Sequence, residues 1–297
     1  MELSRRNILA LLGSAPLLSL PGVALASQKR KVRISFLTDL HLPARNEIND
    51  RAQRIFKKAS DCDLFLFGGD NLMSIDHQPE AEKAAQFDNW SRFLAHNVSK
   101  PHLSVVGNHD IEMWDDGDQS HGCGKRRAME AFVMKHRYWE ERVGGWRIIG
   151  LDTVHRNRVS YYGHVDREQM AWLRSTLEAD KKTPTMVVGH MPLLSVTPLA
   201  DLSTQARPMS MPVSFCSQVG NAREVINLFR QVDNVKLCLS GHTHMVDRCE
   251  FDGTTYLCGG SVSGSWWNGP HQGFAPSYTS IELMQDGTFT TQTVRCG

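Results

Sequence analysis

The chain has 297 residues, of which 41% are hydrophobic and 22% are charged, and its formal net charge is +1. This is an ordinary globular composition, long enough for one large domain or two small ones. The balanced charge argues against a surface for nucleic acid or another polyanion, so we expect no nucleic-acid partner and a local site for any phosphate-bearing ligand.

The N-terminal segment has the pattern of an export signal. Two arginines precede an apolar run over 8–20, and Ala-Leu-Ala at 24–26 has the small-x-small pattern of a cleavage site. The run is short and broken by glycine and proline, whereas a transmembrane helix takes about 20 apolar residues. The letters SRRNIL resemble the twin-arginine signal, which exports folded proteins; an ordinary secretory signal is the alternative. We therefore expect a signal peptide over 1–26, a single domain over 27–297, the twin-arginine export machinery as a partner, and a periplasmic or secreted protein.

The mature chain alternates predicted strands with predicted helices. Short runs rich in Val, Ile, Leu and Phe predict buried strands at 31–39, 63–70, 102–110, 185–190 and 235–242. Apolar residues at helical spacing predict helices at 47–60, 79–96, 166–180 and 221–231. This order is typical of an α/β fold. Two later segments, 246–258 and 277–294, each contain Asp-Gly and predict β-hairpins.

Each of these predicted strands ends in side chains that can bind a metal. The strand ends read TDLH, GGDN, GNHD, VGHMP and SGHTH, and they supply Asp39, His41, Asp70, Asn108, His109, His190, His242 and His244. Taken singly, each motif is typical of a turn or a helix cap. Ligands of open α/β sheets bind at the carboxyl ends of strands, however, so these ends are expected to meet. Imidazoles, carboxylates and an amide without a thiolate suit Mn, Fe, Co, Ni or Zn, and the set predicts a metal site.

The ordered motifs D-x-H, G-D, G-N-H-D, G-H and G-H-x-H resemble the calcineurin-like metallophosphoesterase family, from residue 32 to about 285. The resemblance implies a four-layer α/β sandwich of two mixed β-sheets packed face to face, with helices on the outer faces. It also implies two divalent metal ions of unknown identity as cofactors. Carried over by motif, the first metal would bind Asp39, His41 and His244, the second Asn108, His190 and His242, and Asp70 would bridge both. The complete D-x-H motif argues against the tyrosine-bearing purple acid phosphatase variant.

The resemblance further implies an enzyme, a hydrolase of small phosphomonoesters or phosphodiesters that uses a metal-bridging hydroxide. His109 would serve the leaving group as an acid, and Asp110 would orient its ring; a cap on the next segment is the alternative for Asp110. A nucleotide-conjugate diphosphatase or a cyclic-nucleotide phosphodiesterase is the enzymatic alternative. A metal-binding scaffold without turnover is the alternative of another class, although a scaffold has no need of His109. The oligomeric state stays open.

Three segments are candidates for the rim of the substrate pocket. The long irregular stretches 111–127 and 193–220 follow site residues, and ordinary surface loops are the alternative. Lys125, Arg126 and Arg207 could contact a phosphate, but isolated basic residues usually face water. The pair Trp266 and Trp267, set among glycines, resembles a segment that borders the site in some secreted bacterial members of the family. Core packing is the alternative for this pair, since tryptophans are usually buried.

Overall fold

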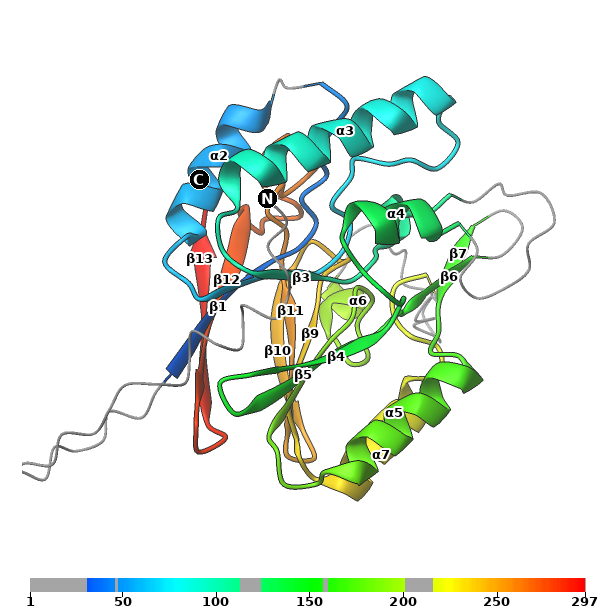
Figure 1. Ribbon diagram of the computed structural model, residues 1–297, viewed down its shortest axis with the longest axis vertical. Helices are drawn as coiled ribbons and strands as arrows, with labels where there is room; N and C mark the ends of the chain where they lie inside the picture. Colours follow the sequence, from blue (N-terminus) through cyan, green and yellow to red (C-terminus); the bar gives the residue numbers. More distant parts are fainter. Residues whose placement is uncertain (1–30, 46–47, 113–123, 157–159, 201–215, 297) are drawn as a thin grey trace, which may run out of the picture.

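Two mixed β-sheets form the centre of the structure (Figure 1). This computed structural model describes residues 31–45, 48–112, 124–156, 160–200 and 216–296, and the predicted signal peptide lies outside these ranges. The first sheet has the strand order β13-β12-β1-β2-β3, and the second has the order β10-β11-β9-β8-β5-β4. A separate two-stranded ribbon consists of β6 (Val154–Arg156) and β7 (Tyr161–Gly163).

In the first sheet β1, β2 and β3 pair in parallel and β12 and β13 pair antiparallel, whereas in the second the four central strands pair in parallel and both edge strands pair antiparallel. The first sheet contains β1 (Lys31–Leu37), β2 (Leu64–Phe67), β3 (His102–Ser104), β12 (Ser277–Met284) and β13 (Phe289–Arg295). The second contains β4 (Trp139–Val143), β5 (Trp146–Gly150), β8 (Thr185–Val188), β9 (Val235–Ser240), β10 (Val246–Phe251) and β11 (Thr254–Gly259). The carboxyl ends of the parallel strands carry the motifs of the predicted metal site. These strands are β1, β2 and β3 in the first sheet and β5, β8, β9 and β11 in the second.

Strand periodicity divides the apolar side chains between two cores. In the register of the first sheet Ile34 lies opposite Ile281 and Leu64, and all three belong to the core between the sheets. The alternate residues Phe65 and Phe67 point outward, where they stack with Phe56 of α2 (Asn49–Ala59) and belong to the core under the helices. The continuous run LFLF of β2 is therefore buried on both faces, as expected of a parallel strand covered by helices. Each such aromatic side chain contributes roughly 1.5 to 3 kcal/mol by burial.

Helices cover the outer faces of the sheets (Figure 1). Helices α2 (Asn49–Ala59) and α3 (Glu80–Asn97) lie side by side against the first sheet, whereas α5 (Arg167–Ala179) and α7 (Ala222–Val232) lie together against the second. The shorter helices are α4 (Arg126–Ala131) and α6 (Thr197–Ala200). Helix α7 shows why the sequence folds this way, since Val225, Leu228, Phe229 and Val232 are its buried residues and share one helical face.

The predicted fold class is confirmed, and both Asp-Gly hairpins are present. β10 and β11 turn at Asp252 and Gly253, both with positive φ, and β12 and β13 turn around Gly287. The sequence did not predict the β4–β5 hairpin or the β6–β7 ribbon. The predicted strands are also longer than the observed ones, because the motif residues lie on the loops beyond the strand ends. Among the described residues, no helix combines the length and apolar character needed to span a membrane.

Candidate metal centre

The strand-end motifs adopt an unusual backbone conformation. Asp39, His41, Asp70, His242 and His244 have φ values of 55°, 48°, 51°, 72° and 58°. This left-handed region is uncommon for residues other than glycine, and buried residues held there cluster at functional sites. The loops after β1, β2 and β9 therefore share the same left-handed backbone turn, which places their polar side chains at the strand ends.

A glycine lets two of these loops approach each other. A Cβ atom added to Gly107 would lie 2.1 Å from Oδ1 of Asp70 and 2.2 Å from the Asp70 backbone nitrogen. A different rotamer of Asp70 would not relieve the contact between the added Cβ atom and the Asp70 backbone nitrogen. Gly107 is thus required for the loop after β3 to place Asn108 and His109 beside the loop after β2.

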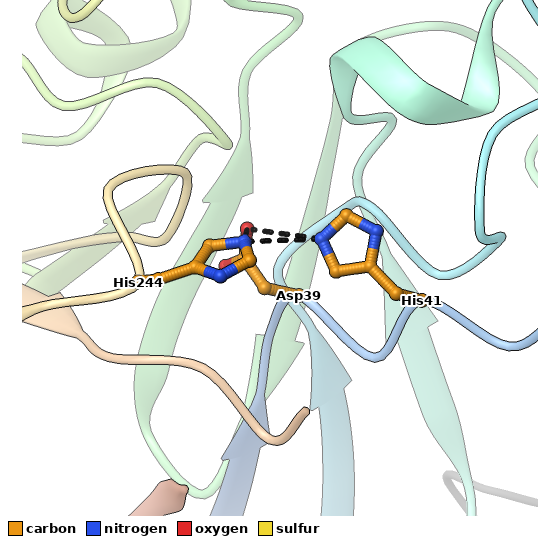
Figure 2. A group of neighbouring side chains, drawn as sticks. All are labelled: Asp39, His41 and His244. Atoms are coloured by element: carbon orange, nitrogen blue, oxygen red, sulfur yellow. Dashed lines mark hydrogen bonds and ion pairs between the residues drawn. The ribbon is translucent and has the colours of Figure 1, made fainter. Parts of the chain in front are cut away.

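The structure brings the predicted metal ligands together. Their candidate ligand atoms form three overlapping groups, each within 4.8 Å: Asp39, His41 and His244 (Figure 2); His41, Asp70 and His109; and Asp70, His190 and His242. Asn108 joins the third group, since its Oδ1 lies 3.0 Å from Nε2 of His190. The predicted ligands are all buried except His242, which is partly exposed.

Short distances link the two halves of this centre. Nε2 of His244 lies 3.2 Å from Oδ1 of Asp39 and 3.0 Å from Nε2 of His41. Oδ2 of Asp70 lies 3.3 Å from Nε2 of His190 and 3.8 Å from Nε2 of His41. Asp70 is therefore positioned between the group around Asp39 and the group around His190.

The hydrogen bonds behind the rings fix which nitrogen faces the centre. Nδ1 of His244 lies 2.6 Å from the carbonyl oxygen of Gly264, and Nδ1 of His190 lies 2.8 Å from that of Gly68. Nδ1 of His41 lies 3.3 Å from the carbonyl oxygen of Met73. Because a carbonyl oxygen only accepts, each Nδ1 carries a proton, and a ring that holds no second proton presents Nε2 to the centre as an acceptor. His242 uses the other atom, since its Nε2 lies 2.7 Å from the Cys216 carbonyl.

Acceptors therefore face acceptors at the middle of the centre. The ring nitrogens of His41 and His244 point at each other, and the nearby side chains Asp39, Asp70 and Asn108 offer oxygens. A single positive charge between the two rings relieves the conflict: burial lowers the pKa of His41 to about 3, whereas at His244 the charge of Asp39 outweighs burial and raises the pKa. A divalent cation satisfies such a set of nitrogen and oxygen donors, so the residues fit a metal.

Charge in the centre favours cations as well. Burial alone would raise the pKa of Asp70, but the surrounding histidines, His190 first, hold it well below its usual value. Burial is likewise outweighed at Asp39, whose pKa is lowered by His244. The partner His190 has a pKa of about 9, because Asp70 outweighs the effect of its burial. Both carboxylates are thus anionic at neutral pH.

His109 borders the buried ligands without being enclosed by them. Its side chain is 26% exposed, its Nε2 lies 4.0 Å from Oδ2 of Asp70, and its ring meets that of His41 edge-on at 4.8 Å between centroids. Its backbone N–H donates to Oδ1 of Asp70 over 2.8 Å. His109 therefore stands where the centre meets solvent.

The structure corrects the predicted role of Asp110. Its Oδ1 accepts from the Leu72 N–H over 3.0 Å and its Oδ2 from the Gly107 N–H over 2.9 Å. Both oxygens are engaged by backbone amides, so the predicted orienting contact with the His109 ring is absent, and capping is the interpretation that fits. Asp110 fastens the loop after β3 to the loop after β2. Burial, with the charge of Asp70, raises its pKa to about 7.

The predicted rim residues have different outcomes. Lys125 is buried and donates to the carboxylate of Asp152, so the hypothesis of a phosphate contact is wrong for this residue. Arg126 is exposed, while Arg207 and the stretches 113–123 and 201–215 lie outside the described residues. The tryptophan pair splits, since Trp267 is 7% and Trp266 37% exposed.

One residue near the centre escaped the sequence analysis. The ring of Tyr161, on β7, meets the ring of His242 edge-on at 5.8 Å between centroids. A lone tyrosine after a segment without periodicity carries no motif, so no signal in the sequence distinguishes it.

Known proteins resemble this chain in sequence and in fold. A sequence profile described as calcineurin-like phosphoesterase matches residues 32–246. The chain is 27% identical over 289 residues to a 3',5'-cyclic-nucleotide phosphodiesterase of Nostoc sp., covering 91% of this chain and 94% of that protein. Over 98 residues it is 35% identical to a manganese-dependent ADP-ribose/CDP-alcohol diphosphatase of Arabidopsis thaliana, covering 32% of this chain and 26% of that one. A dimetal phosphatase structure from Danio rerio has a TM-score of 0.58 at 12% identity, covers 90% of this chain and 99% of its own, and shows similarity of fold.

Proposed function

Because the chain belongs to the calcineurin-like phosphoesterase family and is therefore a metal-dependent phosphoric ester hydrolase, we propose that it cleaves nucleotide-type phosphodiesters at the strand-end centre. The observation that carries the proposal is the convergence of ring nitrogens and carboxylate oxygens of Asp39, His41, Asp70 and His244 on one buried centre. Preference for a diester is supported by the Nostoc relative, which is similar over nearly the whole chain.

We assign the ligands of two divalent metal ions from the geometry of the centre. The first site consists of Asp39, His41 and His244, the second of Asn108, His190 and His242, and Asp70 belongs to both. Two divalent ions supply charge that neutralises phosphoryl oxygens and activates a water molecule.

The chain's own side chains position the substrate and handle the proton. His109 lies at the solvent-facing edge of the centre, where its ring holds a proton for the oxygen of the leaving group. Asp110 acts at a distance from the reaction, because it binds the backbone of Gly107 and Leu72 and so fixes His109 relative to Asp70. The carbonyls of Gly68 and Gly264 hold two ligand rings in the tautomer that the metal requires.

A diphosphatase that cleaves nucleotide conjugates is the second candidate. It is favoured by the local similarity of 35% over 98 residues to the Arabidopsis protein. Both candidates act on a nucleotide-type substrate, but the diphosphatase breaks a phosphoanhydride bond and the phosphodiesterase a phosphoester bond.

The proposal includes export from the cytoplasm. It is supported by the arginine pair, the apolar run and the Ala-Leu-Ala sequence within residues 1–26. A twin-arginine route would let the protein acquire its metals and fold before translocation. The proposed location is accordingly the periplasm or the surrounding medium.

Hydrolysis assays on metal-stripped protein test the function. Each of Mn, Fe, Co, Ni and Zn is restored in turn, with bis-p-nitrophenyl phosphate, p-nitrophenyl phosphate, 3',5'-cyclic AMP and ADP-ribose as substrates. We expect turnover only after metal is restored, with a higher kcat/KM for the diesters than for the monoester. Preference for ADP-ribose would select the second candidate. Turnover that survives complete metal removal, or a lack of turnover on all of these esters, would contradict the proposal.

A further inference from the structure

An exposed tryptophan lies over one half of the metal centre. The ring of Trp266 has its centroid 4.5 Å from that of His244 and 5.5 Å from that of His41. It also lies 6.5 Å from the ring of His109. More than a third of the residue is accessible, at 37%. An apolar surface is thus held beside a charged centre, where burial elsewhere would have been more favourable.

The loop that carries Trp266 is built to expose it. Trp266 and Trp267 both have a left-handed backbone, with φ values of 47° and 70°, which is rare for bulky residues. Trp267 anchors the loop, because its Nε1 donates to the carbonyls of Leu40 and His41 over 3.0 and 3.1 Å. Arg51 adds a hydrogen bond of 2.8 Å from Nη1 to the Trp267 carbonyl. The indole of Trp267 is therefore fixed in the core, and the preceding indole of Trp266 faces the site.

The same loop is tied to the metal ligands. The Gly264 carbonyl accepts from Nδ1 of His244, and the Ser263 N–H donates to the Asp39 carbonyl over 3.2 Å. These hydrogen bonds keep Trp266 in a defined position relative to His244. The left-handed backbone of Trp266 and Trp267 is strained, and backbone strain beside a site supports a role in function.

We propose that Trp266 is a specificity-determining residue that stacks against a planar group of the substrate, a nucleobase or an aromatic leaving group, while the phosphate lies at the metal centre. The inference rests on the proposed function. Trp266 and His109 both contact the ring of His41, so a planar group attached to the leaving side of the ester, near His109, would lie along the indole. Every nucleobase has a π-face, and stacking on an aromatic side chain is tolerant of base identity.

Substitutions with and without an aromatic ring separate stacking from packing. We expect W266L to lower kcat/KM about tenfold for 3',5'-cyclic AMP and bis-p-nitrophenyl phosphate, whose planar groups would lose their stacking partner. For the aliphatic diester glycerophosphocholine the change is expected to stay within about twofold. W266F retains an aromatic face and is expected to keep most of the activity on the planar substrates. W172A is the matched control, since Trp172 is a half-buried tryptophan on α5 that packs against Tyr138.

Fluorescence gives a readout that needs no turnover. In metal-stripped protein, AMP is expected to quench tryptophan emission more than ribose 5-phosphate does, and W266F is expected to lose this difference while W172A keeps it. An equal loss of activity on planar and aliphatic esters in W266L would show that Trp266 only supports His244, and would overturn the inference. Failure of the wild type to hydrolyse any ester would instead contradict the proposed function, and the quenching difference would still decide on Trp266.

Discussion

Two clusters of buried polar side chains differ in how their hydrogen bonds balance. In the cluster behind the β6–β7 ribbon, Lys125 donates to both oxygens of Asp152 over 2.7 and 2.8 Å. Arg137 donates to Asp152 over 3.0 Å and to Asp166 over 2.5 Å. Every contact joins a donor to an acceptor. In the metal centre, by contrast, the Nε2 atoms of His41 and His244 face each other over 3.0 Å, so a positive charge must lie between them.

The difference teaches which buried polar cluster is structural and which is functional. A balanced cluster is complete by itself, so its removal damages the fold. In an unbalanced cluster some acceptors have no donor, and a bound cation has to satisfy them, so the cluster is a candidate metal site. Most side chains of both clusters are buried, so burial alone would not distinguish them.

The largest expected effect comes from converting an acceptor of the centre into a donor. D70N replaces one oxygen by an amide that can donate to Nε2 of His190 or His41, while the other oxygen still accepts from the His109 N–H. We expect activity to fall roughly a thousandfold or more, since the bridging charge is lost. The metal content of the folded protein should fall as well, because the side chain that both groups of ligands share has lost its charge.

D88N is the control for this substitution, since Asp88 is an exposed carboxylate on α3. Its activity and melting temperature should equal those of the wild type. Retention of wild-type turnover by D70N would break the distinction between the two clusters.

The next effect is on stability and comes from the balanced cluster. K125M leaves Asp152 with one donor fewer and is expected to destabilise the fold by about 3 kcal/mol, because removing one member of a buried ion pair leaves the other under-compensated. This corresponds to a fall in Tm of roughly 6 to 12 °C. Metal content of the folded protein should stay at the wild-type value. A variant that keeps its Tm and loses metal would reverse the roles of the clusters.

The smallest effect sharpens the comparison within the centre itself. H109A removes a ring that borders the ligands but is partly exposed, and we expect kcat to fall about a hundredfold as the proton donor is lost. The bound metal should be unchanged, as measured by elemental analysis. H96A, an exposed histidine on α3, serves as the control. Loss of metal in H109A would make His109 a ligand rather than a proton donor.

Much of this organisation could be predicted from the sequence, because the centre follows from strand ends. Asp39, Asp70, Asn108, His190 and His242 each follow a buried apolar run, and chain order alone places such ends together. The Asp-Gly hairpins were predictable because the turn needs positive φ. Strand β4 was not, since WEERV lies at a sheet edge, is half-exposed, and lacks a clean apolar alternation.

Other features depend on geometry that the sequence does not encode locally. Asp110 follows His109 directly, yet its carboxylate turns to the Leu72 and Gly107 amides, which only the meeting of two loops provides. Which tryptophan of the pair is buried depends on two successive left-handed residues. The sequence around Lys125 does not indicate that its ammonium group pairs with Asp152, which is distant in the chain.

Metal content of the folded protein tests the central claim most directly. The wild type, stripped with chelator, reloaded with manganese and freed of excess metal, is analysed by native mass spectrometry for bound ions. We expect two divalent ions for each chain, as the groups that share Asp70 require. A folded wild-type chain that binds none would contradict the assignment of the unbalanced cluster as a metal centre.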